Sequence, residues 1–333
     1  YLHLITDPQA REYVRSRAVV LRTIRHELDE RGYVEVETPV LQSVAGGALA
    51  RPFTTHHHAL DTDLKLRISL ELYLKRLLVG GMERVYEIGR NFRNEGIDRE
   101  HNPEFTMLEL YEAYGDYETM MRIAEDLIRA CAVAVNGSLT LTYRDRTLDL
   151  TPPFHRATVL GSVSEAVGEE VTLDRPDLAD LADRHDVPID PVWGPGKIVL
   201  ELFEKLVEQT LFEPTFVCDF PREVSPLARP HRRDPGLTEH FDVIVGGVEL
   251  GTAFSELTDP IEQRAKFEDQ LAQRMAGDDE AHPLDEDFMT ALEHGMPPAG
   301  GIGIGIDRLL MVLTDAPSLR DLILFPHQRP EAP

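Results

Sequence analysis

The chain has 333 residues, of which 42% are hydrophobic and 28% charged, and 34 Lys and Arg against 59 Asp and Glu give a formal net charge of −25. This composition excludes disordered and fibrous proteins, and the length allows one large domain with an insertion or about two domains. The sequence contains no apolar stretch of membrane-spanning length and no signal peptide, so we expect a cytoplasmic protein. The acidic charge opposes non-specific binding to nucleic acid, and any RNA would bind at a local basic patch.

The first half of the chain predicts a long helix followed by strands. Asp7 and Pro8 can cap a helix whose apolar residues recur at helical spacing as far as Gly32. Residues 33–37 alternate like a half-buried strand that Pro39 ends. Beyond them we expect a helix over 70–79, strands over 85–92 and 104–113 joined by a loop over 96–102, a helix over 117–135 and a strand over 139–143.

The second half predicts a helical insertion within a sheet. Residues 157–210 read as helices with Pro-rich and Asp-rich joints, and the expected strands then resume at 215–220, 241–245 and 248–254. A charged helix, a glycine-rich strand over 300–305 and a last helix from Asp307 follow. We interpret the three adjacent histidines from His56 to His58 as a loop rather than a metal cluster, because adjacent residues of an extended chain point to opposite sides.

A polar pattern surrounds the expected loop at 96–102. Arg93 and Glu95 precede it, and His101, Asn102 and Phe105 follow it. A guanidinium matches phosphate oxygens and a carboxylate can accept from an amine, so the pattern is compatible with a nucleoside triphosphate site. An isolated Arg-x-Glu is more often a surface pair, and this alternative stays open.

Glycines alternate along the strand that leads into the last helix. Without side chains on one face, a flat ligand or another backbone can approach closely, and Arg308 would project over this floor. The run is no Rossmann fingerprint, since Ile306 stands where the third glycine would be, and it is no Walker loop. Tight packing of helix on strand, with Arg308 in solvent, is the alternative.

The dipeptide Gly246-Gly247 predicts a two-residue hairpin turn. In that register Asp242 and Glu249 are diagonal neighbours on one face, and two such carboxylates suit a magnesium ion that also contacts substrate phosphates. Phe254 and Glu256 would lie on the face opposite Glu249 unless a bulge near Gly251 brought both sets into one pocket.

Further acids can line the same pocket. Glu71 begins a helix, and Glu109 and Tyr111 are two residues apart on one strand. Buried carboxylates without partners are costly, so a pocket lined by several of them implies a cationic ligand. Taken singly, each is more often an exposed acid.

Taken together, these motifs resemble the catalytic domain of class II lysyl-tRNA synthetases of the actinobacterial type, over essentially the whole chain. The helix and strand ending at Pro39 are similar to motif 1, residues 91–105 to motif 2 and residues 303–308 to motif 3. Residues 45–48, 71–76, 224–227 and 254–257 are similar to the lysine pocket of that family.

The resemblance implies an α+β fold over residues 1–333, with an antiparallel sheet flanked by helices and the helical insertion at 157–210. It implies activation of L-lysine by ATP and Mg²⁺ to lysyl-adenylate, followed by transfer to tRNA(Lys). A homodimer would form through the helix at 8–31 and the strand to Pro39, and no membrane contact is implied for this chain.

The resemblance also assigns roles to residues. Arg93 and Arg308 are catalytic, with Arg93 at the α-phosphate. The ATP site comprises Arg93, Glu95, His101, Asn102, Phe105, Glu249 and Arg308, with adenine between Phe105 and Arg308. The lysine site comprises Gly46 and Glu71 at the α-amino group, Glu109, Tyr111 and Glu256 around the ε-ammonium, Phe254 along the methylene stem, and Thr252. Asp242 and Glu249 hold the metal.

The chain departs from the family pattern at several places. Thr252 stands where the family usually has asparagine, next to the carboxylate of the amino acid, and Glu100 stands where an arginine commonly precedes the motif 2 histidine. No oligonucleotide-binding barrel precedes Tyr1, so we expect the N-terminal anticodon-binding domain to be absent, either removed or never present.

Other acceptors of the lysyl group stay open. Residues 248–253 are similar to the synthetase portion of a bifunctional lysyl-phosphatidylglycerol synthase. A truncated paralogue that lysylates a protein such as elongation factor P is the second alternative, and the motif 3 segment disfavours it. A non-enzymatic paralogue is disfavoured because the expected catalytic arginines and metal carboxylates are all present.

Overall fold

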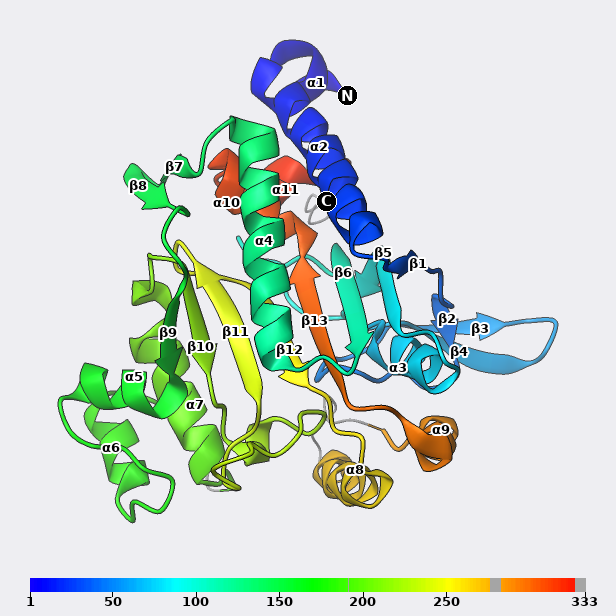
Figure 1. The fold of residues 1–333 in the computed structure, drawn as a ribbon, viewed down its shortest axis with the longest axis vertical. Helices are drawn as coiled ribbons and strands as arrows, with labels where there is room; N and C mark the ends of the chain where they lie inside the picture. Colours follow the sequence, from blue (N-terminus) through cyan, green and yellow to red (C-terminus); the bar gives the residue numbers. More distant parts are fainter. Residues whose placement is uncertain (191, 276–282, 327–333) are drawn as a thin grey trace, which may run out of the picture.

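A mixed sheet forms the centre of the protein in the computed structural model, which describes residues 1–190, 192–275 and 283–326 (Figure 1). Eight strands of the described residues pair in the order β1-β5-β6-β13-β12-β11-β10-β9. Their bounds are β1 (Val34–Glu35), β5 (Arg84–Phe92), β6 (Glu104–Ala113), β9 (His155–Thr158), β10 (Thr215–Cys218), β11 (His240–Val245), β12 (Val248–Ser255) and β13 (Ala299–Gly305). The six strands from β5 to β10 pair antiparallel, as expected, whereas the edge strands β1 and β9 pair parallel with their neighbours.

Helices cover the sheet and its edges. They are α1 (Leu2–Thr6), α2 (Pro8–Glu30), α3 (Glu71–Val79), α4 (Tyr117–Asn136), α5 (Val159–Val167), α6 (Leu178–Arg184), α7 (Pro195–Leu206), α8 (Pro260–Met275), α9 (Glu286–Gly295), α10 (Ile306–Thr314) and α11 (Leu319–Leu322), with short 3-10 turns η1 (Glu208–Thr210) and η2 (Arg222–Val224). Among the residues that the structure describes, no helix combines the length and apolarity needed to cross a membrane.

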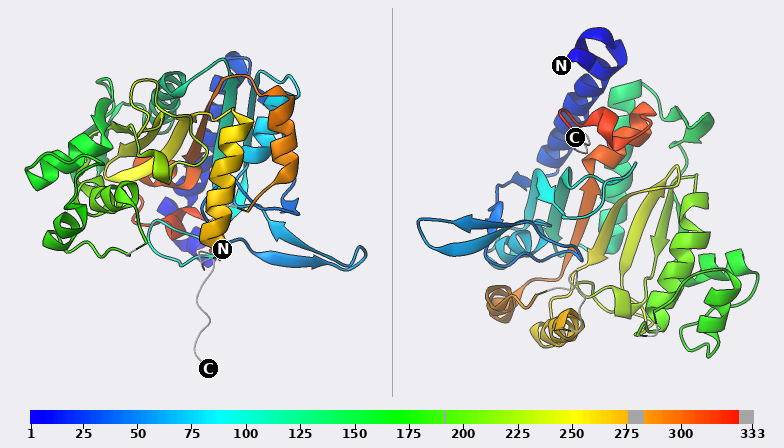
Figure 2. Two further views of the ribbon diagram at one scale, coloured as in Figure 1. Left: turned by 90° about the horizontal axis from the view of Figure 1, so that it is seen from below. Right: turned by 180° about the vertical axis from the view of Figure 1, so that it is seen from behind.

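The largest hydrophobic core lies on one face of the sheet. Helix α4 crosses this face, and α2 and α10 pack beside it (Figure 1). The view from behind shows the opposite face, which α4 does not cross (Figure 2). Because side chains alternate along a strand, Leu108 and Leu110 enter this core while Glu109 and Tyr111 point to the other face. The strand carboxylates that line the cavities, Glu109, Asp242 and Glu249, therefore lie on the face away from α4.

The helices α5, α6 and α7 lie beside strand β9 at one edge of the sheet (Figure 1). They share a hydrophobic cluster of their own, which includes Val163, Leu181 and Leu202. Val217 and Ile244 from the sheet extend this cluster, so the helical segment is packed against the face of β10 and β11. Helix α7 thereby reaches the edge of the charged face.

The expected hairpin at Gly246 and Gly247 is confirmed. Val245 pairs with Val248 and Ile244 with Glu249, and the register then shifts so that Val243 pairs with Gly251. One extra residue on β12 produces a bulge next to Gly251, which is the condition under which Glu249 and Phe254 can share one pocket. The bulge turns Glu249 to the same face as the next residues of β12 that line the pocket.

Two short segments differ from the sequence-based expectations. The strand expected over 33–37 is only Val34–Glu35. The Val36 nitrogen still donates to the Tyr86 carbonyl at 2.9 Å, and farther along the Thr38 nitrogen donates to the Glu87 carboxylate at 3.0 Å rather than to a strand carbonyl. The expectation of a loop at His56 and His57 is wrong. Both lie in β3 (Thr54–His57), which pairs with β4 (Thr62–Leu66), and β4 also pairs with β2 (Leu41–Gln42).

A cross-strand contact explains the extended histidines. His56 is paired with Asp63 in the ladder, and its Nδ1 lies 2.8 Å from the Asp63 carboxylate.

The strand expected at 139–143 is β7 (Thr140–Tyr143), which pairs with β8 (Arg146–Asp149) in a separate ribbon.

A buried carboxylate ties the long N-terminal helix to the site strands. Asp307 is 2% exposed, accepts a hydrogen bond from the Thr106 backbone nitrogen at 2.8 Å, and is paired with Arg17 of α2. We expect Asp307→Ala to lower the free energy of unfolding by about 3 kcal/mol, because it leaves Arg17 and the Thr106 N–H without their acceptor. Urea denaturation measures this. Asp126→Ala is the control, since Asp126 pairs with Arg31 while 56% exposed and should cost less than about 0.5 kcal/mol. Equal losses would contradict the proposed link.

Candidate active site

Two cavities open on the face of the sheet away from α4. The first lies between the loop after β5 and the start of α10, and the second lies between α3, α7 and the strands β6, β11 and β12. Both are lined by Arg93, Met107, Glu249, Thr252 and Gly303. The cavities are therefore joined, and a molecule bound in one would meet a molecule bound in the other at these residues.

Arg308 is held at the wall of the first cavity by residues from separate elements. Its guanidinium donates to the backbone oxygen of Glu249 at 3.0 Å and to the Glu249 carboxylate at 3.2 Å. A second guanidinium nitrogen lies 3.0 Å from Nε2 of His101, whose Nδ1 lies 2.8 Å from the Asp98 carboxylate. When Nδ1–H of His101 donates to the Asp98 carboxylate, Nε2 carries the lone pair and can accept from Arg308. Arg308 is thus positioned in the cavity and not left in solvent.

The other expected nucleotide residues line the same cavity. The Arg93 guanidinium lies over the Phe105 ring, 5.1 Å from its centroid, and Arg93 Nε donates to the Ile68 carbonyl at 3.4 Å. Asn102 is buried and donates to the Glu104 carbonyl at 2.5 Å, while its own carbonyl oxygen has no partner among the described residues. Glu95 is exposed at the cavity mouth. An aromatic ring, an unused amide oxygen and two arginines together suit a flat base with an anionic tail.

Glu109 stands in the second cavity with three neutral donors around it. Its carboxylate accepts from Leu70 N at 2.9 Å, from Ser69 Oγ at 3.0 Å and from the Tyr111 hydroxyl at 3.2 Å. Burial raises the pKa of Glu109 to about 7, although the hydrogen bonds from Leu70, Ser69 and Tyr111 oppose this shift. Among the described residues only these neutral groups donate to the Glu109 carboxylate, and no cation is paired with it, so an incoming ammonium group would be favoured there.

The glycines of β13 make room for these side chains. A Cβ at Gly301 would collide with the Glu256 carboxylate and the Tyr111 ring, and a Cβ at Gly303 would lie 2.9 Å from the terminal carbon of Met107. The glycine floor therefore serves the acidic cavity as well as the junction of the two cavities.

A buried lysine joins two carboxylates beside the second cavity. Lys75 is fully buried, and its Nζ lies 2.5 Å from a carboxylate oxygen of Glu71 and 2.5 Å from one of Glu256. Of the two glutamates, Glu71 lines the second cavity and Glu256 is buried without lining it. Gly46, expected at the α-amino group, is buried as well, and its neighbour Gly47 lines the cavity instead. The sequence reasoning missed Lys75, although the spacing of Glu71 and Lys75 by four residues in a helix is typical of an ion pair.

His240 is a second residue that sequence reasoning missed. Its Nε2 lies 2.9 Å from the Thr252 hydroxyl and 3.2 Å from the Asp242 carboxylate, and its Nδ1 lies 2.8 Å from Ser225 Oγ. The ring also stacks on Phe220 at a centroid distance of 3.7 Å. The signal in the sequence was the spacing of His240 and Asp242, which places them on one face of a strand. The expected lysine residues Thr252 and Phe254 both line this part of the cavity.

The two expected metal residues line the second cavity within a strongly acidic region. Asp242 and Glu249 both face it, and Glu204 of α7 lines it as well. Burial, the Glu249 charge and the Glu204 charge raise the pKa of Glu208 to about 7, which reflects unbalanced negative charge. Within 1–190, 192–275 and 283–326, no group of three or more His, Cys, Asp and Glu side chains could hold a metal alone. The donor set therefore fits a magnesium ion that takes one or two carboxylates and completes its shell with phosphate oxygens and water.

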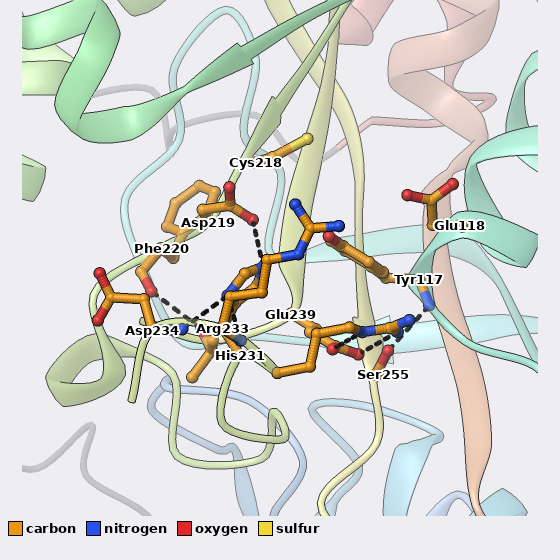
Figure 3. Close-up of polar contacts among 12 residues, drawn as sticks. Tyr117, Glu118, Cys218, Asp219, Phe220, His231, Arg233, Asp234, Glu239 and Ser255 are labelled. Atoms are coloured by element: carbon orange, nitrogen blue, oxygen red, sulfur yellow. Dashed lines mark hydrogen bonds and ion pairs between the residues drawn. The ribbon is translucent and has the colours of Figure 1, made fainter. Parts of the chain in front are cut away.

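A buried ion-pair network anchors the strand that carries Phe254 and Glu256. The Glu239 side chain is fully buried and is paired with Arg229 at 2.5 Å and with Arg232. Burial alone would raise its pKa, but hydrogen bonds from Arg232, Ser255 and Arg229 lower the pKa of Glu239 to about 2. Ser255 Oγ in turn accepts from the Tyr117 backbone nitrogen at 3.0 Å (Figure 3). These contacts fix β12 to α4 directly behind the second cavity.

The fold and the joined cavities define a class of protein: residues 1–329 match the family described as tRNA synthetases class II (D, K and N), and the chain belongs to this family. It is 54% identical over 335 residues to the lysine–tRNA ligase of Moorella thermoacetica and 57% identical over 335 residues to that of Deinococcus radiodurans. These alignments cover 99% of the chain, and 68% and 63% of the two relatives. The lysine–tRNA ligase of Gloeobacter violaceus is 54% identical, with 100% of the chain and 67% of the relative covered. The chain thus spans about two thirds of the length of these relatives.

Proposed function

We propose that the protein activates L-lysine with ATP, forming lysyl-adenylate and pyrophosphate, and transfers the lysyl group to tRNA(Lys). The observation that carries this proposal is the junction of the two cavities at Arg93 and Glu249. One cavity has arginines and an aromatic ring for a nucleotide, and the other has Glu71 and Glu109 for a ligand with ammonium groups. The names of the relatives support lysine as the amino acid and tRNA as the acceptor.

In the first step an oxygen of the lysine carboxylate attacks the α-phosphorus of ATP, and the bond from this phosphorus to the pyrophosphate oxygen breaks. The nucleophile is already ionised, so the step needs no general acid or base from the protein. Arg93 at the junction would neutralise charge on the α-phosphate, and Arg308 would face the nucleotide from the opposite wall. Positioning and charge stabilisation then supply the rate acceleration.

Asp242 and Glu249 are the residues that would hold magnesium, because Glu249 lies at the cavity junction and Asp242 lines the second cavity, paired across the sheet with Thr252 of the junction. When bound there, the ion would neutralise negative charge on the ATP phosphates. The protein's own part is to hold Glu249 in place, which Arg308 does through its contacts to the Glu249 backbone oxygen and carboxylate.

The proposal includes a homodimer formed through α2 and the segment that follows it. Val34, Val40 and Leu41 are 46%, 38% and 48% exposed, although all three are large and apolar. They lie at or next to the short strands β1 and β2, and β1 is an edge strand of the sheet. Contact with a second copy would cover this apolar edge. Analytical ultracentrifugation of the purified protein tests the state, and a monomer at micromolar concentration would contradict it.

Lysine-dependent exchange of pyrophosphate into ATP tests the proposed first step. We expect exchange with lysine and much weaker exchange with ornithine and arginine, and β-lysine is included to define the backbone requirement. Charging of tRNA is then measured with the same protein. Exchange with charging would support the full proposal, exchange without charging would point to another acceptor, and no exchange would overturn the assignment of the activity.

A further inference from the structure

We infer that Lys75 is a positioning residue that determines specificity. Its buried ammonium pairs with Glu71 and Glu256 and compensates one of the three carboxylate charges in this part of the pocket. Two carboxylate charges then remain, which suits a ligand with two ammonium groups. The inference rests on the proposed function, because it takes L-lysine as the ligand. Lys75 does not itself line the cavity and acts through the two glutamates.

The geometry places Lys75 between the two ends of the lysine site. Its Nζ lies 2.5 Å from Glu71, the residue expected at the α-amino group, and 2.5 Å from Glu256, one of those expected near the ε-ammonium. Lys75 is 0% exposed, and Glu71 and Glu256 are 4% and 1% exposed. The Glu256 oxygens have no hydrogen-bond partner among the described residues apart from this ion pair. A single nitrogen thus fixes one carboxylate from each end of the site.

The charges explain why the pocket needs this ammonium. Glu71, Glu109 and Glu256 all lie in the interior around Tyr111, and their mutual repulsion and burial disfavour three simultaneous negative charges. Lys75 compensates one of them, so two remain when all three acids are ionised. L-lysine supplies two ammonium groups to this shell, while its carboxylate would lie toward Arg93 at the cavity junction.

The pKa shifts of Glu256 and Lys75 agree with this charge count. Burial raises the pKa of Glu256 to about 8, and the Lys75 ammonium is the largest influence that lowers it. Burial by itself would lower the pKa of Lys75, but the Glu256 and Glu71 carboxylates outweigh burial and raise it. Removal of the ammonium would therefore raise the pKa of Glu256 further above 8, so lysine would have to displace a more tightly held proton on binding.

The test is calorimetric titration of lysine into the wild type and into Lys75→Met, in two buffers that differ in ionisation enthalpy. For Lys75→Met we expect a lysine affinity at least about tenfold lower at pH 7, because its Glu256 would hold the proton more tightly than in the wild type. At pH 9, where Glu256 of the wild type has largely lost its proton, the variant should still release up to about one additional proton per lysine bound, a difference that mere loss of packing would not produce. A folded Lys75→Met with wild-type affinity and proton release would overturn the inference.

Glu256→Gln and the double variant Lys75→Met/Glu256→Gln keep the test open if Lys75→Met does not fold. In the Glu256→Gln background one carboxylate has already been removed, so the loss of Lys75 should cost several-fold less lysine affinity than in the wild type. A further loss of about tenfold or more in the double variant, measured against Glu256→Gln alone, would show that Lys75 only fills space, and this comparison does not need the single variant Lys75→Met. Lys197→Met is the matched control, because Lys197 pairs with Glu201 on α7 and lies outside both cavities.

The same titrations separate this inference from the proposed activity. Wild-type protein that binds lysine without catalysing pyrophosphate exchange would contradict the activity but leave the role of Lys75 to be decided by the variants. Wild-type protein that binds no lysine would overturn both.

Discussion

Replacing Arg308 with alanine is expected to reduce lysine-dependent pyrophosphate exchange by about 10³-fold or more without unfolding the protein. Arg308 holds the Glu249 carboxylate and backbone oxygen and the His101 ring, so its loss removes a cation from the nucleotide cavity and releases two residues beside it. Rapid measurement of exchange at saturating ATP and lysine gives the effect on the chemical step. Circular dichroism and the thermal midpoint report on folding.

A second arginine provides the control for this experiment. Arg129 is 25% exposed, pairs with Glu125 and donates to the carbonyls of Leu150, Thr151 and Pro152, all away from the two cavities. Arg129→Ala should keep exchange within about threefold of wild type while lowering stability modestly. An Arg308→Ala variant that exchanges pyrophosphate as well as Arg129→Ala would show that Arg308 does not act on the nucleotide.

The hairpin shows what sequence reasoning can achieve for this fold. Two glycines set the turn, the turn sets the register, and the register places Asp242 and Glu249 on one face. A bulge near Gly251 was only the condition under which Glu249 and Phe254 could share one pocket, and the observed register shift meets this condition. Each step depends on neighbours in the sequence, and each is confirmed by the observed pairing.

The remainder depends on contacts between distant segments. Lys75 was visible as a lysine in an amphipathic helix, but its second partner Glu256 lies on a different strand. Glu204 reaches the cavity only because the helical segment packs on β10 and β11. Similarly, Gly47 rather than the neighbouring Gly46 lines the cavity. Which of the two glycines does so depends on a backbone turn in which Gly47 has a φ of +88°. No local pattern carries such information.

The acidity of the pocket could be predicted from the sequence more easily than the internal cation that compensates part of its negative charge. Several acids at strand and helix positions implied a cationic ligand, because unpaired buried carboxylates are unfavourable. The same argument gave no sign that the protein supplies one of the cations itself. Of the three acids around Tyr111, Glu71 and Glu256 pair with Lys75, whereas Glu109 accepts hydrogen bonds from the neutral donors of Ser69, Leu70 and Tyr111.

Glu109→Gln is expected to raise the KM for lysine by about 100-fold at pH 8, with a smaller change in kcat. The variant keeps the size of the side chain but cannot offer a charge to an ammonium group. The pKa of Glu109 is about 7 in the unliganded protein, above its ordinary value of 4.5, chiefly because of burial. Lysine binding requires the ionised form, so the KM of the wild type should rise as the pH falls below about 7. The pH profile of KM in exchange assays measures both effects.

The sign of this dependence distinguishes recognition by Glu109 from a general loss of structure. The folded protein binds the Glu109 proton more tightly than the unfolded chain does, so this group favours the unliganded fold at low pH, and its contribution declines as the pH rises from about 4.5 to 7. Stability and lysine affinity therefore change in opposite directions over that range. Glu112→Gln is the control, since Glu112 lies on the same strand, accepts from the Tyr33 hydroxyl at 2.7 Å and points away from the cavity. If Glu109→Gln kept the pH-dependent KM of the wild type, another acid would have to receive the ammonium group.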